Sequence, residues 1–297
     1  MIAETTKQQI ADRLREYSER MGSQNKAANS LKAVSAGTVS QILNSNWELI
    51  SDEMWRSIGA QIGWAENEWV IVATRDFRML LALQEDARLN ANVFGITGEA
   101  GSGKSVALRQ YAEINKRVYL VQCAEYWNRK MFMGELLTVM GKDFSGWTVG
   151  EMMHEVVRGL KAQEKPLLIL DEADKLSDQV LYFFITLYNQ LEDNCGIILI
   201  ATDHLEKRIK RGLKLNKKGY KEIYSRIGRR FLKLHGVGST DIAQVCGANG
   251  ITDPKIVKEI IADSDYDLRR IKRKIHAIKA MKKANENDQE NDQNTAN

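Results

Sequence analysis

The chain has 297 residues, 43 of them Lys or Arg and 39 Asp or Glu, with a net charge of +4 and a hydrophobic share of 43%. This length allows one to three domains with a sizeable core, and three widely spaced cysteines argue against a disulfide framework or a zinc site. No apolar run approaches the ~20 residues of a membrane span, and the first residues lack the pattern of a secretion signal. We therefore expect a soluble cytoplasmic protein without a membrane partner.

Residues 1–66 are expected to form an all-α domain. Apolar residues recur at helical spacing in this segment, and Ser35 is placed as the N-cap of the third helix. The expected helices cover residues 6–20, 25–32, 35–44 and 52–62. The second and third helices are short and are joined by a tight turn, which is typical of a helix-turn-helix.

The third of these helices begins with small residues, which would allow close approach to a DNA groove. Thr38, Ser40 and Gln41 could then form hydrogen bonds with bases or phosphates. The stretch 27–43 resembles the helix-turn-helix of the lambda-repressor-like family, and this resemblance implies DNA binding. A small helical bundle without DNA contacts would show the same pattern, so that alternative remains open.

The segment Gly98–Ser105 fits the pattern G-x-x-x-x-G-K-[ST] of a phosphate-binding loop, between a strand-like stretch and a helical one. Lys104 would place its charge on the β- and γ-phosphates, and the Ser105 hydroxyl would complete a Mg²⁺ shell. Three glycines would let successive backbone N–H groups surround a phosphate: Gly98, Gly101 and Gly103. We therefore expect the chain to bind ATP or GTP.

Four apolar residues run into an acidic segment at Leu167–Asp174. This pattern is typical of a buried parallel strand whose carboxyl end reaches the phosphates. Asp171 would hold the Mg²⁺ shell, and Glu172 would act as the base that orients the attacking water. Helix capping is the alternative role for the aspartates. The next strand-like stretch ends at Thr202, which could sense the γ-phosphate, with Asp203 as the second candidate.

Strands and helices alternate throughout residues 67–235, which indicates a parallel sheet with helices on both faces. The spacing of the phosphate loop, the acidic strand and the Thr202 strand resembles that of the AAA+ ATPases. This resemblance implies an α/β P-loop core with the sheet order 5-1-4-3-2. It also implies ATP sites at subunit interfaces, each completed by an arginine of the neighbouring subunit.

Three arginines near the end of this segment are candidates for the arginine that reaches the neighbouring subunit. Arg226 is the first choice, followed by Arg229 and Arg230. One guanidinium can match the planar charge of the transition state in phosphoryl transfer. The alternative is that all three are solvated arginines on a helix surface.

Basic residues are dense between residues 207 and 221, a stretch without a carboxylate. Such a run is usually a solvated face, but inside an ATPase domain it favours contact with DNA phosphates. A second candidate surface is the loop with Tyr126 and Trp127, although these aromatic residues could equally belong to the core. The candidate DNA-binding residues in these two places are Lys207, Arg208, Lys210, Arg211, Arg129 and Lys130.

Residues 236–284 are expected to form three helices that cover the nucleotide as a lid. The sequence around Asp267 resembles the G-D-x-R motif of AAA+ lids, which gives Arg269 the place of the sensor arginine, although Asp265 stands for the usual glycine. The last lid helix is rich in Lys and Arg and is a third possible DNA surface. Residues 285–297 have no apolar anchor and are expected to form a disordered tail.

A helix-turn-helix, an AAA+ core and a basic lid in one chain resemble the transposition regulators of the MuB and TnsC type. This resemblance implies ATP and Mg²⁺ as cofactors, and assembly of many copies into a filament or ring on double-stranded DNA without strong sequence preference. It further implies delivery of that DNA to a transposase and release when ATP is hydrolysed. Two alternatives remain open. One is a helicase loader or replication ATPase of the same superfamily, and the other is a transcription regulator whose ATPase domain senses nucleotide.

Overall fold

The computed structural model describes residues 2, 4–62, 64 and 69–295. The chain divides into two compact units, Met1–Val70 and Ile71–Asn297. The domain junction predicted near residue 66 lies outside the described residues. Within the described part, no helix is long and apolar enough to cross a membrane.

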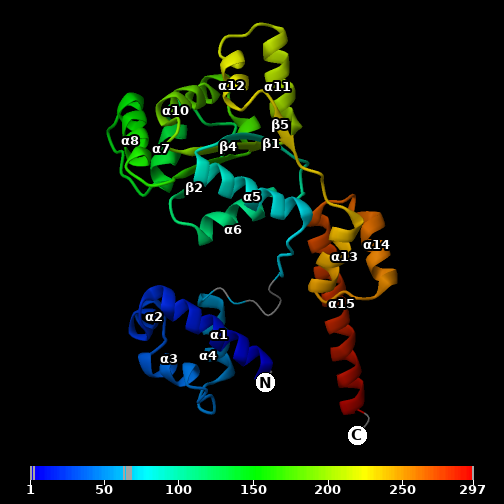
Figure 1. Cartoon of the computed structure of the whole chain (residues 1–297). Helices are drawn as coiled ribbons and strands as arrows, with labels where there is room; N and C mark the ends of the chain where they lie inside the picture. The colour runs from blue at the N-terminus through cyan, green and yellow to red at the C-terminus, as the bar shows by residue number, and fades with distance from the viewer. Residues whose placement is uncertain (1, 3, 63, 65–68, 296–297) are drawn as a thin grey trace. The chain divides into compact units, whose positions relative to one another are not determined.

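The described residues of the first unit form four helices, which pack around one apolar core (Figure 1). They are α1 (Glu4–Met21), α2 (Gln24–Ser30), α3 (Ala36–Leu43) and α4 (Asp52–Gln61). As predicted, Ser35 caps α3: its side chain accepts a hydrogen bond from the Thr38 N–H at 3.0 Å. Val39 and Ile42 of α3 and Trp55 of α4 are fully buried, so the predicted amphipathic pattern builds this core.

The second unit is built on a parallel sheet of five strands. They are β1 (Val93–Thr97), β2 (Val118–Gln122), β3 (Leu167–Asp171), β4 (Gly196–Ala201) and β5 (Phe231–Lys233). Their order is β2-β3-β4-β1-β5, which confirms the predicted order 5-1-4-3-2. The register pairs Thr97 with Ala201 and Asp171 with Ile200, so the carboxyl ends of the three central strands lie along one edge.

Helices cover both faces of this sheet, as Figure 1 shows. Leu167 and Ile169 of β3 pack with α5 and α6, while the alternate residues Leu168 and Leu170 pack with the helices of the other face. Because every residue of β3 and β4 is buried, these strands are continuous apolar runs. The core helices are α5 (Arg75–Asn90), α6 (Lys104–Ile114), α7 (Arg129–Val139), α8 (Val149–Lys161), η1 (Ala173–Lys175, a 3₁₀ turn), α9 (Asp178–Leu181), α10 (Phe183–Leu191), α11 (Asp203–Lys214) and α12 (Tyr220–Arg226).

Three further helices follow the sheet: α13 (Ser239–Ala248), α14 (Pro254–Ser264) and α15 (Leu268–Thr295). Buried Asp76 at the start of α5 ties the connection to them in place, accepting hydrogen bonds from the N–H groups of His235 at 3.0 Å and Gly236 at 2.8 Å. α15 continues through residues 285–295, where the sequence predicts a disordered tail. This stretch contains neither Gly nor Pro and extends a helix already anchored by buried Ile271 and Ile275.

Candidate nucleotide site

The phosphate loop lies between the carboxyl end of β1 and the first turn of α6. Gly101 and Gly103 have φ angles of 75° and 90°, a left-handed conformation that favours glycine. The Lys104 amine donates hydrogen bonds to the carbonyl oxygens of Gly98 at 2.8 Å and Glu99 at 2.6 Å, which folds the side chain back over the loop. Burial lowers the pKa of the Lys104 amine, and the nearby Asp171 carboxylate opposes this change.

Ser105 and Asp171 meet beside this loop. The Ser105 hydroxyl donates a hydrogen bond to Asp171 Oδ2 at 2.6 Å, and Asp171 is only 2% exposed. Burial raises the pKa of the Asp171 carboxyl, although hydrogen bonds from Ser105 and from the Glu172 N–H oppose the shift. A hydroxyl and a buried carboxylate side by side fit Mg²⁺, which prefers oxygen ligands.

The surroundings of this pair also fit a partly hydrated ion. Among the described residues, no group of three or more His, Cys, Asp or Glu could hold a metal. One hydroxyl and one carboxylate, those of Ser105 and Asp171, would supply only part of a coordination shell. That is the arrangement expected of Mg²⁺, which keeps waters and binds substrate phosphates.

Glu172 follows directly and has a φ of 56°, which turns the chain out of β3. Its carboxylate accepts hydrogen bonds from the Lys175 amine at 2.7 Å and the Gln122 amide at 3.4 Å. Burial would raise the pKa of Glu172, but these partners outweigh it and the pKa is lowered. The side chain is therefore a carboxylate at neutral pH, as a base must be.

Thr202 lies at the end of β4, beside the acidic segment. Its hydroxyl donates a hydrogen bond to Asp174 Oδ2 at 2.6 Å, three residues after Asp171. The second candidate, Asp203, is exposed and forms an ion pair with Lys207 at 2.5 Å. The geometry therefore brings Thr202, rather than Asp203, to the acidic segment.

The start of α15 touches the phosphate loop. The Leu268 N–H donates a hydrogen bond to the Gly101 carbonyl at 3.0 Å. A Cβ atom at Gly101 would lie 2.2 Å from Asp267 Cγ, so only glycine fits beneath that carboxylate. The charge of Arg269 lowers the pKa of both Lys104 and Glu172, which places this guanidinium within electrostatic reach of the site.

Tyr266, and not Asp265, stands at the glycine position of the lid motif. In the G-D-x-R spacing, the residue directly before Asp267 is Tyr266, so Tyr266 rather than Asp265 takes the place of the glycine. Both residues have positive φ angles, 57° for Tyr266 and 51° for Asp265. The turn thus keeps a conformation that glycine would favour, even though neither residue is glycine.

Arg226 lies at the opposite end of the sheet. Its guanidinium carbon sits 4.8 Å from the ring centroid of Tyr188, and its Nε is buried without a hydrogen-bond partner among the described residues. A cavity of about 310 Å³ is lined by Arg226 together with Val93 and Ile197, which lie at the amino ends of β1 and β4. The five residues of β1 span roughly 16 Å. Arg226 is therefore separated from the phosphate loop of its own chain.

The basic residues of α11 divide between two faces. Lys207, Lys210, Arg211 and Lys214 recur at helical spacing and are exposed, opposite buried Ile209. Lys207 and Lys210 pair with Asp203 and Glu206, carboxylates that lie just before the acid-free stretch. Arg208 points inward and binds Asp178, so the structure does not place it on the surface where the sequence predicts DNA contact.

The other predicted DNA contacts lie at two places. Arg129 and Lys130 are exposed at the start of α7. In the loop before them, Tyr126 is 71% exposed, whereas Trp127 is 7% exposed and packs in the core. In the first unit, Thr38, Ser40 and Gln41 are all half-buried.

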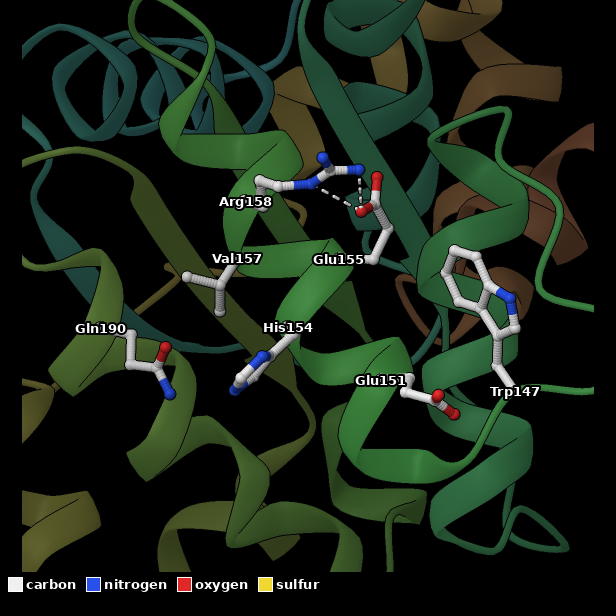
Figure 2. Close-up of a pocket in the computed structure, with 7 residues that line it drawn as sticks. All are labelled: Trp147, Glu151, His154, Glu155, Val157, Arg158 and Gln190. Atoms are coloured by element: carbon white, nitrogen blue, oxygen red, sulfur yellow. Dashed lines mark hydrogen bonds and ion pairs between the residues drawn. The ribbon is translucent and has the colours of Figure 1, made fainter.

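A second cavity of about 510 Å³ lies on the α8 side of the core. Figure 2 shows its lining residues, among which Arg158 and Glu155 form an ion pair. None of the residues predicted to bind nucleotide or DNA lines it. Its residues are Trp147, Glu151, His154, Glu155, Val157, Arg158 and Gln190.

Comparison with known proteins agrees with this site. The model of an AAA domain family matches residues 87–209, which contain the phosphate loop, the acidic strand and Thr202. The chain is 24% identical over 246 residues to the Mu-like prophage FluMu DNA transposition protein B of Haemophilus influenzae, covering 80% of this chain and 84% of that protein.

Solved structures of RuvB from Thermotoga maritima have a lower sequence identity to the chain. A RuvB mutant has a TM-score of 0.46 and 13% identity, covering 72% of this chain and 64% of that one. The structure described as the RuvB Holliday junction branch migration motor has a TM-score of 0.45 and 15% identity, covering 71% and 63%. The chain thus spans slightly less than two thirds of these structures. The chain therefore contains an AAA domain, and over four fifths of its length it is similar to a transposition protein B.

Proposed function

We propose that this protein is an ATP-dependent DNA-binding regulator of transposition. In this proposal many copies assemble on double-stranded DNA, deliver it to a transposase and are released when ATP is hydrolysed. The observation that carries the proposal is the position of Arg226, at the sheet edge opposite the phosphate loop. A single chain therefore holds two halves of a site that only a second copy can join.

Each residue of the phosphate-loop half has a role that follows from its surroundings. The Lys104 amine would leave the carbonyl oxygens of Gly98 and Glu99 for the phosphates. The Glu172 carboxylate would orient the attacking water and accept its proton. Ser105 and Asp171 would hold Mg²⁺, which neutralises phosphate charge when bound. Thr202 and Arg269 would sense the γ-phosphate.

The other half would come from a neighbouring subunit. Arg226 would supply a planar cation to the charge that develops on the transferred phosphoryl group. Since ATP would lie between two subunits, its binding would favour assembly and its hydrolysis would favour separation. Assembly would in turn strengthen DNA binding, because many weak phosphate contacts act together on one duplex.

The exposed face of α11 is the surface we assign to DNA. Lys207, Lys210, Arg211 and Lys214 follow one side of this helix. Lysine and arginine contacts with phosphates carry no sequence information, so binding would depend on salt and little on sequence. The helix-turn-helix proposed for the first unit would add a second contact. The similarity to a transposition protein B supports a transposase as the partner.

The proposal is tested by DNA affinity with and without nucleotide. Fluorescence anisotropy with two unrelated labelled duplexes should show tight binding to both only when ATP and Mg²⁺ are present, and affinity should fall steeply with salt. A protein lacking residues 1–66 should keep ATP-dependent binding to both duplexes. Tight binding to one operator without nucleotide would instead identify a transcription regulator.

A further inference from the structure

We propose that Arg208 is a positioning residue that couples the acidic segment of the nucleotide site to the helix that ends at Arg226. The inference rests on the proposed function, in which Arg226 acts on the site of a neighbouring subunit. It removes Arg208 from the DNA-binding surface and assigns it to the communication between the two half-sites of one chain.

The Arg208 side chain is 25% exposed and joins several elements. Its Nη1 donates hydrogen bonds to the carbonyl oxygens of Leu176 at 2.6 Å and Asp174 at 3.3 Å. Its Nε and Nη2 both bind Asp178 Oδ1, the former at 3.1 Å. A planar guanidinium can hold carbonyls and a carboxylate together, whereas a lysine amine has fewer donors and no fixed plane.

The same network reaches the first residue of α12. Tyr220 is 2% exposed, and its hydroxyl donates to Asp178 Oδ1 at 2.7 Å and accepts a hydrogen bond from Arg208 Nε at 3.3 Å. A Cβ at Gly212 would lie 2.4 Å from the Tyr220 ring, so α11 and α12 pack at a distance that only glycine permits. Tyr220 is therefore held by a polar contact at its hydroxyl and a tight contact at its ring.

α12 is short and rigid enough that a change in the position of Tyr220 also moves Arg226, the proposed arginine finger. It runs from Tyr220 to Arg226 in seven residues, so a shift at its first residue moves its last. At the other end of the network, the Asp174 carboxylate accepts a hydrogen bond from the Thr202 hydroxyl at 2.6 Å. This contact joins the network to Thr202, the predicted γ-phosphate sensor. A continuous chain of contacts thus connects Thr202 to the helix of Arg226 through Arg208.

The test mixes two variants that each lack one half of the site. Lys104→Ala keeps the finger but lacks the loop lysine, and Arg226→Ala keeps the loop but lacks the finger. Each alone should lose DNA-stimulated ATPase activity. Their equimolar mixture should recover activity, because about a quarter of head-to-tail interfaces join an intact loop to an intact finger.

Arg208→Gln is then added to one partner at a time. In the Lys104→Ala partner, which donates the finger, it should reduce the recovered activity about tenfold or more, because a misplaced catalytic group costs that much. In the Arg226→Ala partner, which donates the loop, recovery should stay within about threefold. A role confined to folding would lower both arms equally. Tyr220→Phe, which keeps the ring, should show the same asymmetry with a smaller loss.

Three results would overturn the inference. Equal recovery with and without Arg208→Gln in the finger donor would show that Arg208 does not position Arg226, and so would equal losses in both arms. Failure of the original mixture to recover any activity would refute the shared site of the proposed function, and the inference would fall with it. Thermal unfolding checks that every variant folds, and ATP affinity checks that the variants that keep Lys104 bind nucleotide.

Discussion

The Ser105 hydroxyl donates a hydrogen bond to Asp171 Oδ2 at 2.6 Å and so joins the phosphate loop to the central strand β3. The accepting carboxylate is almost fully buried, and burial raises the pKa of Asp171. A charged carboxylate in such a place is costly until a cation joins it. We propose that this pair binds a metal ion and that the buried carboxylate lowers the stability of the free protein.

Asp171→Asn should therefore stabilise the nucleotide-free protein. Removing the buried charge should add about 1 kcal/mol to the free energy of unfolding and raise the melting temperature by about 2–4 °C. Because the folded pKa is raised, the advantage of the variant should be largest at neutral pH and should shrink as pH falls through that pKa. Scanning calorimetry across pH measures both effects.

Asp143→Asn is the matched control for that change. Asp143 is exposed, and hydrogen bonds from Ser145 lower its pKa, so its charge is favourable in the folded chain. Its replacement should not raise the melting temperature. A melting temperature of Asp171→Asn below that of the unaltered protein at neutral pH would contradict the account of a costly carboxylate.

Glu172→Gln should separate ATP binding from hydrolysis. Loss of the base should slow hydrolysis about 10²- to 10⁴-fold, while ATP affinity should change little. Since hydrogen bonds from Lys175 and Gln122 lower the pKa of Glu172, its protonation should not reduce the rate between pH 8 and about pH 5. Steady-state ATPase assays and fluorescent nucleotide titration measure the two quantities. The exposed Glu113→Gln serves as control, and a loss equal to that of Glu172→Gln would remove the special role of Glu172.

Arg226→Ala should abolish hydrolysis but not nucleotide binding. An arginine finger contributes roughly 10³-fold or more to the rate, and Arg226→Lys should not restore it, because an amine cannot match the planar charge. Arg229→Ala and Arg230→Ala are neighbouring controls on exposed residues, with expected losses below about tenfold. If Arg229→Ala or Arg230→Ala lost more ATPase activity than Arg226→Ala, that residue would be the arginine finger instead.

The exposed face of α11 should set the salt dependence of DNA binding. Changing Lys207, Lys210, Arg211 and Lys214 to Gln together should reduce the slope of log affinity against log salt by about 0.9 for each DNA phosphate that a basic side chain no longer neutralises. Arg208→Gln should leave this slope unchanged, because its side chain faces Asp178. Anisotropy titrations over a series of salt concentrations provide the slopes. An unchanged slope in the quadruple variant would exclude this face from DNA binding.

Local signals in the sequence indicated which residues of the phosphate-loop half lie together. Gly98–Ser105 and Asp171–Glu172 are contiguous patterns, and their flanking residues indicate the strands and the helix that position them. The structure brings the two segments together. Strand β5 was harder to locate, because three residues with partly exposed side chains give little periodicity. Its place in the sheet followed only from the resemblance to AAA+ proteins.

The sequence did not indicate whether a given side chain points into the core or toward solvent. Arg208 belongs to a dense basic run, yet its partner Asp178 lies 30 residues earlier and meets it only in the folded core. Trp127 and Tyr126 are neighbours, but one is buried and the other is exposed. Such contacts depend on packing between distant elements, which a pattern of residue types does not encode.

Electron microscopy of the protein with double-stranded DNA would show whether ATP controls assembly. A site shared between subunits predicts ordered assemblies on DNA when ATP and Mg²⁺ are present, which persist with Glu172→Gln because ATP is bound but not hydrolysed. It predicts none without ATP, and none with Lys104→Ala, whereas the exposed Lys116→Ala should assemble normally. Assemblies that form equally well with Lys104→Ala or without nucleotide would contradict it, because ATP would then not control the joining of the two half-sites.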